Sequence, residues 1–157
     1  MTEERRAWLF DFGGGLRAVI GGLHLSEYLL APQVFKVPLT PVAVCGVLVW
    51  RKRLVPLLDF TQLVANNSGE PADKPKNAIV LVYRTTPKAP LLYGALALAT
   101  TPREIGVRDD LACELPAQPA FWKVLAASCI HYESYPTPIL RVGNIFTQAL
   151  KVSGTLA

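Results

Sequence analysis

The sequence predicts a mostly β fold of the barrel or sandwich type. Roughly nine short apolar runs of strand composition are separated by glycine- and proline-rich turns, and few windows are long enough for a helix. A chain of 157 residues is near the usual size of one domain and can bury a substantial core without disulfides or a metal. We therefore expect residues 1–157 to form one domain made of two lobes.

The chain is predicted to open with a β-hairpin. Trp8–Phe12 and Leu16–Ile20 are β-prone, and the three glycines between them tolerate the positive φ angles of a tight turn. The next apolar run, Leu23–Leu30, is too short for periodicity to distinguish a helical turn from a strand.

A second hairpin is predicted around a basic turn. Gly46–Trp50 and Leu54–Leu58 should pair as strands. Pro56 cannot donate to a β-ladder, so we expect it at an edge or a bulge. Asp59 then fits the N-cap of a short helix over Phe60–Ala65, because its carboxylate can accept backbone N–H bonds.

A polar loop near residues 66–77 separates two β-rich halves, which we expect to form the two lobes. Ala78–Arg84 and Leu91–Leu98 are nearly continuous apolar runs, as expected of strands buried on both faces at the shared core. Two further strands and a short helix capped by Asn144 are predicted at Ser128–Tyr132, Ile139–Val142 and Asn144–Leu150.

Composition argues against several classes of partner. Hydrophobic residues make up 51% of the chain, yet the longest apolar stretches fall well short of the roughly 20 residues of a membrane-spanning helix. The N-terminus mixes charges and lacks a secretory signal, so we expect a cytoplasmic protein. The net charge is +4, but the basic residues are dispersed, so no nucleic-acid partner is expected.

No catalytic residue, cofactor or metal site is predicted. Cys45, Cys113 and Cys129 are far apart in sequence, lack paired ligand spacing and are expected to be reduced thiols. Cys129 and His131 place a thiol near an imidazole, but local spacing suggests no third residue that would orient the imidazole.

The most informative stretch runs from Pro38 to Phe60. Its pattern is P-x-x-P-x-x-x-x-G-V-x-x-x-R-x-x-x-V-P-L-L-D-F, in which order and spacing are more specific than any single residue. The pattern resembles the most recognisable segment of the CheW-like domain, an adaptor of bacterial chemosensory arrays. The positions that match this family are Pro38, Pro41, Gly46, Arg51, Pro56 and Asp59, together with Gly94 in the later strand that carries the second barrel.

The resemblance implies a fold and a function. The fold would be two small five-stranded SH3-like β-barrels packed on a shared hydrophobic core, with short helices. The function would be a non-enzymatic adaptor that couples the cytoplasmic tips of methyl-accepting chemoreceptors to a CheA-type histidine kinase, in flagellar chemotaxis or pilus-type signalling. Such an adaptor joins membrane-bound receptor arrays through its partners and does not insert into the membrane. The alternative is a β-barrel interaction module of an unrelated cytoplasmic complex.

The chain departs from the family pattern at several positions. Lys52 replaces a glycine of the hairpin turn, and Val64 lies near the place of a glycine that ends the following helix. Leu98 and Ala99 occupy the region where the family commonly has an aspartate. These departures indicate a divergent member with an altered hairpin turn.

The resemblance also places two binding surfaces on the first barrel. Glu27 and Arg51 are expected to pair through two parallel hydrogen bonds and to contact the receptor, together with Leu25, in the groove between the barrels. The residues expected to meet the kinase are Val47, Val49 and Lys52. A mean hydropathy of +0.30 without a membrane span indicates that apolar patches remain exposed for such contacts.

Overall fold

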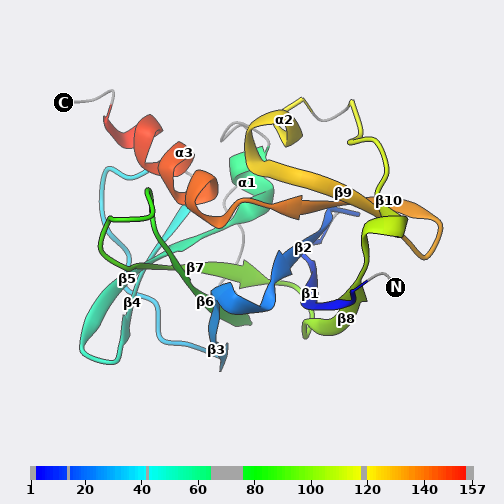
Figure 1. Cartoon of the computed structure of the whole chain (residues 1–157). Helices are drawn as coiled ribbons and strands as arrows, with labels where there is room; N and C mark the ends of the chain where they lie inside the picture. The colour runs from blue at the N-terminus through cyan, green and yellow to red at the C-terminus, as the bar shows by residue number, and fades with distance from the viewer. Residues whose placement is uncertain (1–2, 14, 42, 65–75, 118–119, 155–157) are drawn as a thin grey trace.

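The computed structural model consists of two five-stranded sheets and short helices (Figure 1). It describes residues 3–13, 15–41, 43–64, 76–117 and 120–154. The first sheet contains β1 (Arg5–Asp11), β2 (Arg17–Gly21), β8 (Arg103–Val107), β9 (Ala126–Tyr132) and β10 (Tyr135–Leu140). The second contains β3 (Leu25–Leu30), β4 (Val44–Trp50), β5 (Arg53–Leu58), β6 (Asn77–Tyr83) and β7 (Leu92–Leu98). The helices are α1 (Phe60–Val64), α2 (Trp122–Leu125) and α3 (Val142–Gly154), with 3-10 turns η1 (Gly22–His24) and η2 (Asp109–Leu111).

The strand order is β8-β1-β2-β10-β9 in the first sheet and β3-β6-β7-β5-β4 in the second. Each sheet therefore keeps two edge strands, as in a small barrel that is open along one seam. The predicted mostly β fold with two five-stranded units is confirmed.

The two sheets are not built from successive halves of the chain, so the predicted assignment of the halves to the lobes is wrong. The first sheet combines β1 and β2 with β8 to β10, and the second takes all of β3 to β7. Pairings between distant strands cause this interleaving. Two are parallel, β10 with β2 and β5 with β7, and two are antiparallel, β1 with β8 and β3 with β6. Most of the predicted 66–77 loop lies outside the described residues.

Three hydrophobic clusters hold the fold together. The largest, the shared core, takes residues such as Phe10 and Ile20 from the first sheet, Ile79 and Leu96 from the second, and Phe146 from α3. Each sheet also encloses a smaller cluster of its own. The second sheet's own cluster, the inner cluster, consists of Leu48, Trp50, Val55, Leu57, Ala78, Val80 and Ala95.

Strands β6 and β7 are buried on both faces, as their continuous apolar sequences predict. Successive side chains of a strand point to opposite faces. In β6, Ile79 accordingly joins the shared core while Val80 joins the inner cluster. Leu96 of β7 lies in the shared core. Val80 is fully buried as well, but its register turns it to the inner cluster.

Both predicted hairpins form, and the second one turns on residues other than glycine. Trp8 pairs with Ile20 in the first hairpin, and Trp50 pairs with Arg53 in the second. The two turn residues between them, Arg51 and Lys52, have φ angles of 48° and 62°. Positive φ at both central residues defines the type I′ turn, which usually carries Asn-Gly or Gly-Gly. Arg51 and Lys52 therefore form a tight two-residue turn without a glycine.

Pro56 does not lie at an edge or at a bulge, because β5 is an interior strand between β7 and β4. It sits opposite Val47, whose N–H and C=O both bond to Phe35 on the other side of β4, at 2.9 Å each. The Val47–Pro56 pair is thus a position of the ladder that needs no N–H from Pro56. On the other side, the parallel pairing of β5 with β7 begins only at Leu57.

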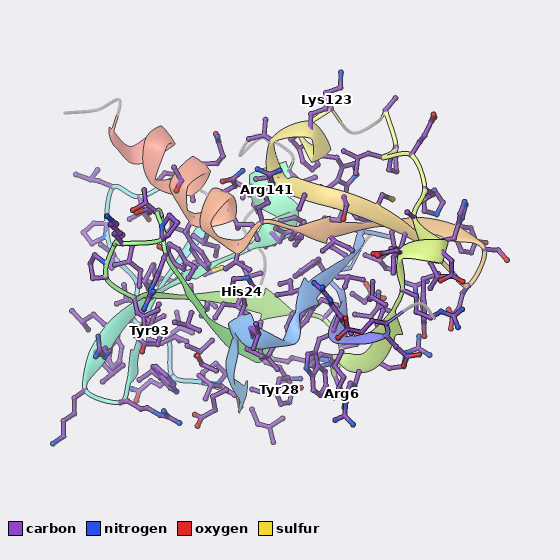
Figure 2. The ribbon with its side chains drawn as sticks, in the orientation of Figure 1. Arg6, His24, Tyr28, Tyr93, Lys123 and Arg141 are labelled. Carbon is purple, nitrogen blue, oxygen red and sulfur yellow. The ribbon has the colours of Figure 1, made fainter. Side chains whose placement is uncertain are left out.

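The structure decides the ambiguous run at Leu23–Leu30 and shows that the predicted cap at Asn144 is wrong. The run at Leu23–Leu30 is both a helical turn and a strand, because η1 is followed directly by β3. His24, labelled in Figure 2, lies in η1. Its Nδ1 donates to Val82 O of β6 at 2.9 Å. Asn144 does not cap the last helix, because α3 begins earlier, at Val142. Its Nδ2 instead donates to Val124 O in α2 at 2.7 Å and so joins the two helices.

Within the part of the chain that the structure describes, none of the helices has the length and the apolar composition of a membrane-spanning segment.

Replacing Leu96 by alanine should lower the free energy of unfolding by about 2–5 kcal/mol, the usual result of truncating a fully buried aliphatic side chain. Urea denaturation followed by tryptophan fluorescence would measure the change. Leu30, on edge strand β3 and 74% exposed, is the matched control and should lose less than about 0.5 kcal/mol when changed to alanine. A loss below that value for Leu96→Ala would remove β7 from the shared core.

Replacing Lys52 by glycine should raise the free energy of unfolding by about 0.5–1 kcal/mol, because glycine adopts the positive φ without the clash of a Cβ atom. The matched control is Arg53→Gly, one residue later in β5, where glycine should destabilise the strand. Thermal and urea melts of both variants would measure whether the free energy of unfolding rises for Lys52→Gly and falls for Arg53→Gly. Equal destabilisation by both substitutions would show that the turn is not strained.

Candidate protein interaction site

The predicted motif surrounds the β4–β5 hairpin and fixes its shape. Gly46 lies beside a register irregularity of β4 and has φ 149°, which disfavours a side chain. A Cβ atom there would collide with the carbonyl oxygen of Phe35, whose segment pairs with Val47 along the free edge of β4. Glycine therefore lets the incoming connection lie close against the hairpin.

Other motif residues have structural roles. The Oδ1 atom of Asp59 accepts the backbone N–H of Thr61 at 3.0 Å, so the prediction that Asp59 caps α1 is confirmed. Pro41 O accepts the N–H of Val44 at 2.9 Å where the connection that also contains Pro38 enters β4. A Cβ atom on Gly94 would collide with the ring of Phe146, so this glycine allows α3 to pack directly on β7.

Glu27, Trp50 and Arg51 form a connected cluster between β3 and the hairpin tip. Glu27 Oε1 is 3.6 Å from Arg51 Nη2, and Glu27 Oε2 accepts a hydrogen bond from Trp50 Nε1 at 3.0 Å. The guanidinium carbon of Arg51 lies 4.6 Å from the centroid of the Trp50 ring. The predicted pairing of Glu27 with Arg51 is present, but not as two parallel hydrogen bonds, because one carboxylate oxygen binds the indole.

Burial differs sharply within this cluster. Trp50 is 6% exposed and belongs to the inner cluster, whereas the side chains of Arg51 and Glu27 are 66% and 43% exposed. An ion pair this exposed contributes at most about 1 kcal/mol to stability. The arrangement therefore presents a fixed guanidinium to solvent while its aromatic support stays in the core.

A second arginine stacks beside the first, which the sequence did not indicate. The guanidinium carbon of Arg53 lies 4.8 Å from the centroid of the Tyr93 ring, and the Tyr93 and Trp50 ring centroids are 5.3 Å apart. Tyr93 belongs to β7, so its place beside the hairpin depends on the parallel β5–β7 pairing. The exposed side chains of Arg51, Lys52 and Arg53 give the hairpin tip an excess of positive charge.

A shallow groove of about 360 Å³ lies between β3 and β4, the two edge strands of the second sheet. Glu27, Trp50 and Arg51 line one part of it, and Leu29 and Phe35 line another. The groove is therefore at the open seam of one sheet and not between the two sheets. Of the three predicted receptor residues, Leu25 is not part of it: this side chain packs against the shared core.

The three predicted kinase residues do not share one environment. Val49 is 61% exposed and pairs across the hairpin with Leu54, which is 73% exposed. Val47 is half-buried and lines a second, apolar groove of about 190 Å³ with Phe146 of α3. Val49 also borders the groove of Glu27 and Arg51, so the two predicted surfaces meet at β4.

Cys45 lies in β4 beside the inner cluster, whereas Cys129 and His131 lie in β9 of the first sheet. Burial, and then the nearby carboxylate of Asp59, raise the pKa of the Cys45 thiol to about 11, so it stays protonated. Cys129 is 2% exposed in β9, whereas His131 on the same strand is exposed. Within the described ranges, no group of three or more His, Cys, Asp or Glu side chains is placed to hold a metal ion.

Comparison with known proteins identifies the family and the fold. A family model described as the CheW-like domain matches residues 7–96, which is more than half of the 157 residues. The crystal structure of the scaffolding protein TtCheW from Thermoanaerobacter tengcongensis superposes with a TM-score of 0.71, covering 92% of this chain and 88% of that one at 11% identity. No curated protein matches the sequence significantly. The structural likeness, at this identity, concerns the fold, and the family match covers the whole motif from Pro38 to Asp59: the chain belongs to the CheW-like domain family.

Proposed function

We propose that this protein is a non-enzymatic adaptor that couples the cytoplasmic tips of methyl-accepting chemoreceptors to a CheA-type histidine kinase, in bacterial chemotaxis or pilus-type chemosensory signalling. The observation that carries the proposal is the exposed Arg51, at the arginine position of the family motif, held by Glu27 and by the Trp50 ring. The protein would act in the cytoplasm and reach membrane-bound receptor arrays through these partners.

The receptor surface in this proposal is the groove between β3 and β4 with Glu27 and Arg51 at one end. The carboxylate contacts both the guanidinium and the indole, which limits the orientations that the guanidinium can take. A guanidinium oriented before binding loses less side-chain entropy on binding, so it favours recognition more than it favours folding. Leu25 is left out of this surface because it packs against the shared core.

The kinase surface in this proposal is centred on Val49 and Leu54 and adjoins the receptor groove at Val49. Their exposure puts two adjacent apolar side chains on one face, and contiguous exposed apolar residues commonly mark interaction sites. Val47 continues this face toward α3, and Lys52 lies at its tip.

The direct test is reconstitution from purified components. The full chain would be mixed with a receptor cytoplasmic tip and with the regulatory domain of a CheA-type kinase, and a ternary complex would be measured by analytical ultracentrifugation. A complex containing all three supports the adaptor function. Binding to neither partner would favour an interaction module of another complex.

Reversing either charge of the ion pair, by Glu27→Arg or Arg51→Glu, should weaken receptor binding by at least about tenfold, which corresponds to about 1.4 kcal/mol. The double swap should partly restore affinity because it recreates an opposite-charge pair. Isothermal titration calorimetry would measure the affinities, and thermal melts would confirm that each variant is folded.

The pair Arg6–Glu104, with N and O atoms 3.3 Å apart on the first sheet, is a matched exposed control. Reversing its charges should leave receptor affinity unchanged. If the Glu27 and Arg51 reversals behave like this control, the ion pair has no part in receptor recognition.

The two proposed surfaces adjoin at Val49 but should still be separable by mutation. Val49→Asp should abolish kinase binding and spare receptor binding, and Arg51→Glu should do the reverse. Leu23, 96% exposed in η1, supplies the control Leu23→Asp, which should affect neither partner. If both substitutions impair the binding of both partners equally, the two surfaces are one shared site that extends across Val49.

A further inference from the structure

Cys113 and Cys129 come into contact at an edge of the first sheet, although 16 positions separate them in the sequence. Their Sγ atoms are 3.3 Å apart, and the backbone N–H of Cys113 donates to Cys129 O at 3.0 Å. The preceding residue, Ala112, forms an antiparallel bridge with Ile130. The two cysteines are therefore neighbours across a short β-ladder that joins the connection after η2 to β9.

This contact brings two thiols close enough to react with each other. A disulfide requires Sγ atoms about 2.0 Å apart and Cα atoms usually about 4.4–6.8 Å apart. Directly opposed residues of an antiparallel ladder have Cα atoms about 4.5–5.5 Å apart, which is within that range. We propose that Cys113 and Cys129 form a reversible intramolecular disulfide in response to peroxide, which locks the connection at residues 108–117 onto the edge of β9.

The two thiols differ in access, which assigns the order of the chemistry. Cys113 is partly exposed and Cys129 is 2% exposed. Burial, and then contact with Cys113, raise the pKa of Cys129 to about 12, so its thiol is not the first to attack. The Cys113 sulfur attacks one oxygen of hydrogen peroxide, which breaks the O–O bond, forms a sulfenic acid and releases water.

The Cys129 sulfur then attacks the sulfenic sulfur of Cys113. The S–S bond forms, the S–O bond breaks, and the leaving oxygen takes the Cys129 proton to give a second water. In total two thiols lose two electrons and two protons to one peroxide molecule, and a dithiol reductant reverses the step.

The disulfide would act at β9, an edge strand of the first sheet. β9 pairs with β10 on one side only, and its other side is covered by the short ladder at Ala112 and Cys113. Such a short ladder opens more easily than the interior of a sheet. Closing the loop covalently should therefore protect the Cys113 amide from hydrogen exchange and raise the melting temperature by about 5–10 °C.

The experiment uses the full reduced chain and hydrogen peroxide, followed by alkylation of the remaining thiols under denaturing conditions. Trypsin cleaves after Lys123 and so separates the two cysteines onto different peptides. Mass spectrometry should find these peptides joined through Cys113 and Cys129, and dithiothreitol should release them. The melting temperature of the oxidised chain should rise by the amount above and return on reduction.

Three variants keep the result interpretable. Cys45→Ser retains both partners and should form the same disulfide, whereas Cys113→Ser and Cys129→Ser should show neither the joined peptides nor the rise in melting temperature. Full alkylation of both thiols after peroxide treatment would overturn the proposal. So would a disulfide to Cys45, a disulfide between two copies of the chain, or a joined pair that leaves the melting temperature unchanged.

Discussion

Strands β6 and β7 must satisfy two hydrophobic clusters at once, and this constraint organises the rest of the molecule. One face of each strand belongs to the inner cluster and the other to the shared core, so no position in the middle of β6 can carry a polar side chain. Close packing on the shared side further limits side-chain size. Gly94 is the clearest case, because the ring of Phe146 occupies the space that a Cβ atom would need.

The exposed cluster at the hairpin tip depends on this buried arrangement. Trp50 lies in the inner cluster and also donates to Glu27, so one side chain is both a core residue and the support of the exposed ion pair. Tyr93 contributes in the same way through its contact with the Trp50 ring. Substitutions in the inner cluster should therefore shift the side chains that line the groove, even where no exposed residue is changed. A loss of binding affinity in such a variant would reflect altered packing as well as lost recognition.

Local features of the fold could be predicted from the sequence, and non-local ones could not. Both hairpins, the Asp59 cap and the two doubly buried strands follow from turn chemistry, capping and apolar runs. The assignment of strands to sheets failed because it depends on pairings between distant strands, such as the antiparallel pairing of β1 with β8 and the parallel pairing of β5 with β7. Glu27 and Arg51 were paired by family resemblance, but the roles of Trp50, Arg53 and Tyr93 appear only when three strands are assembled.

The change from the family's turn glycine to Lys52 exchanges an unstrained turn for added charge. The turn keeps a positive φ at this position, so the lysine adds backbone strain without altering the hairpin's path. What it adds is a third cation beside Arg51 and Arg53, while Glu27 is the carboxylate that contacts this tip among the described residues. An excess of positive charge at this tip would speed the approach of an acidic partner and make that rate sensitive to salt, because screening by salt weakens such steering.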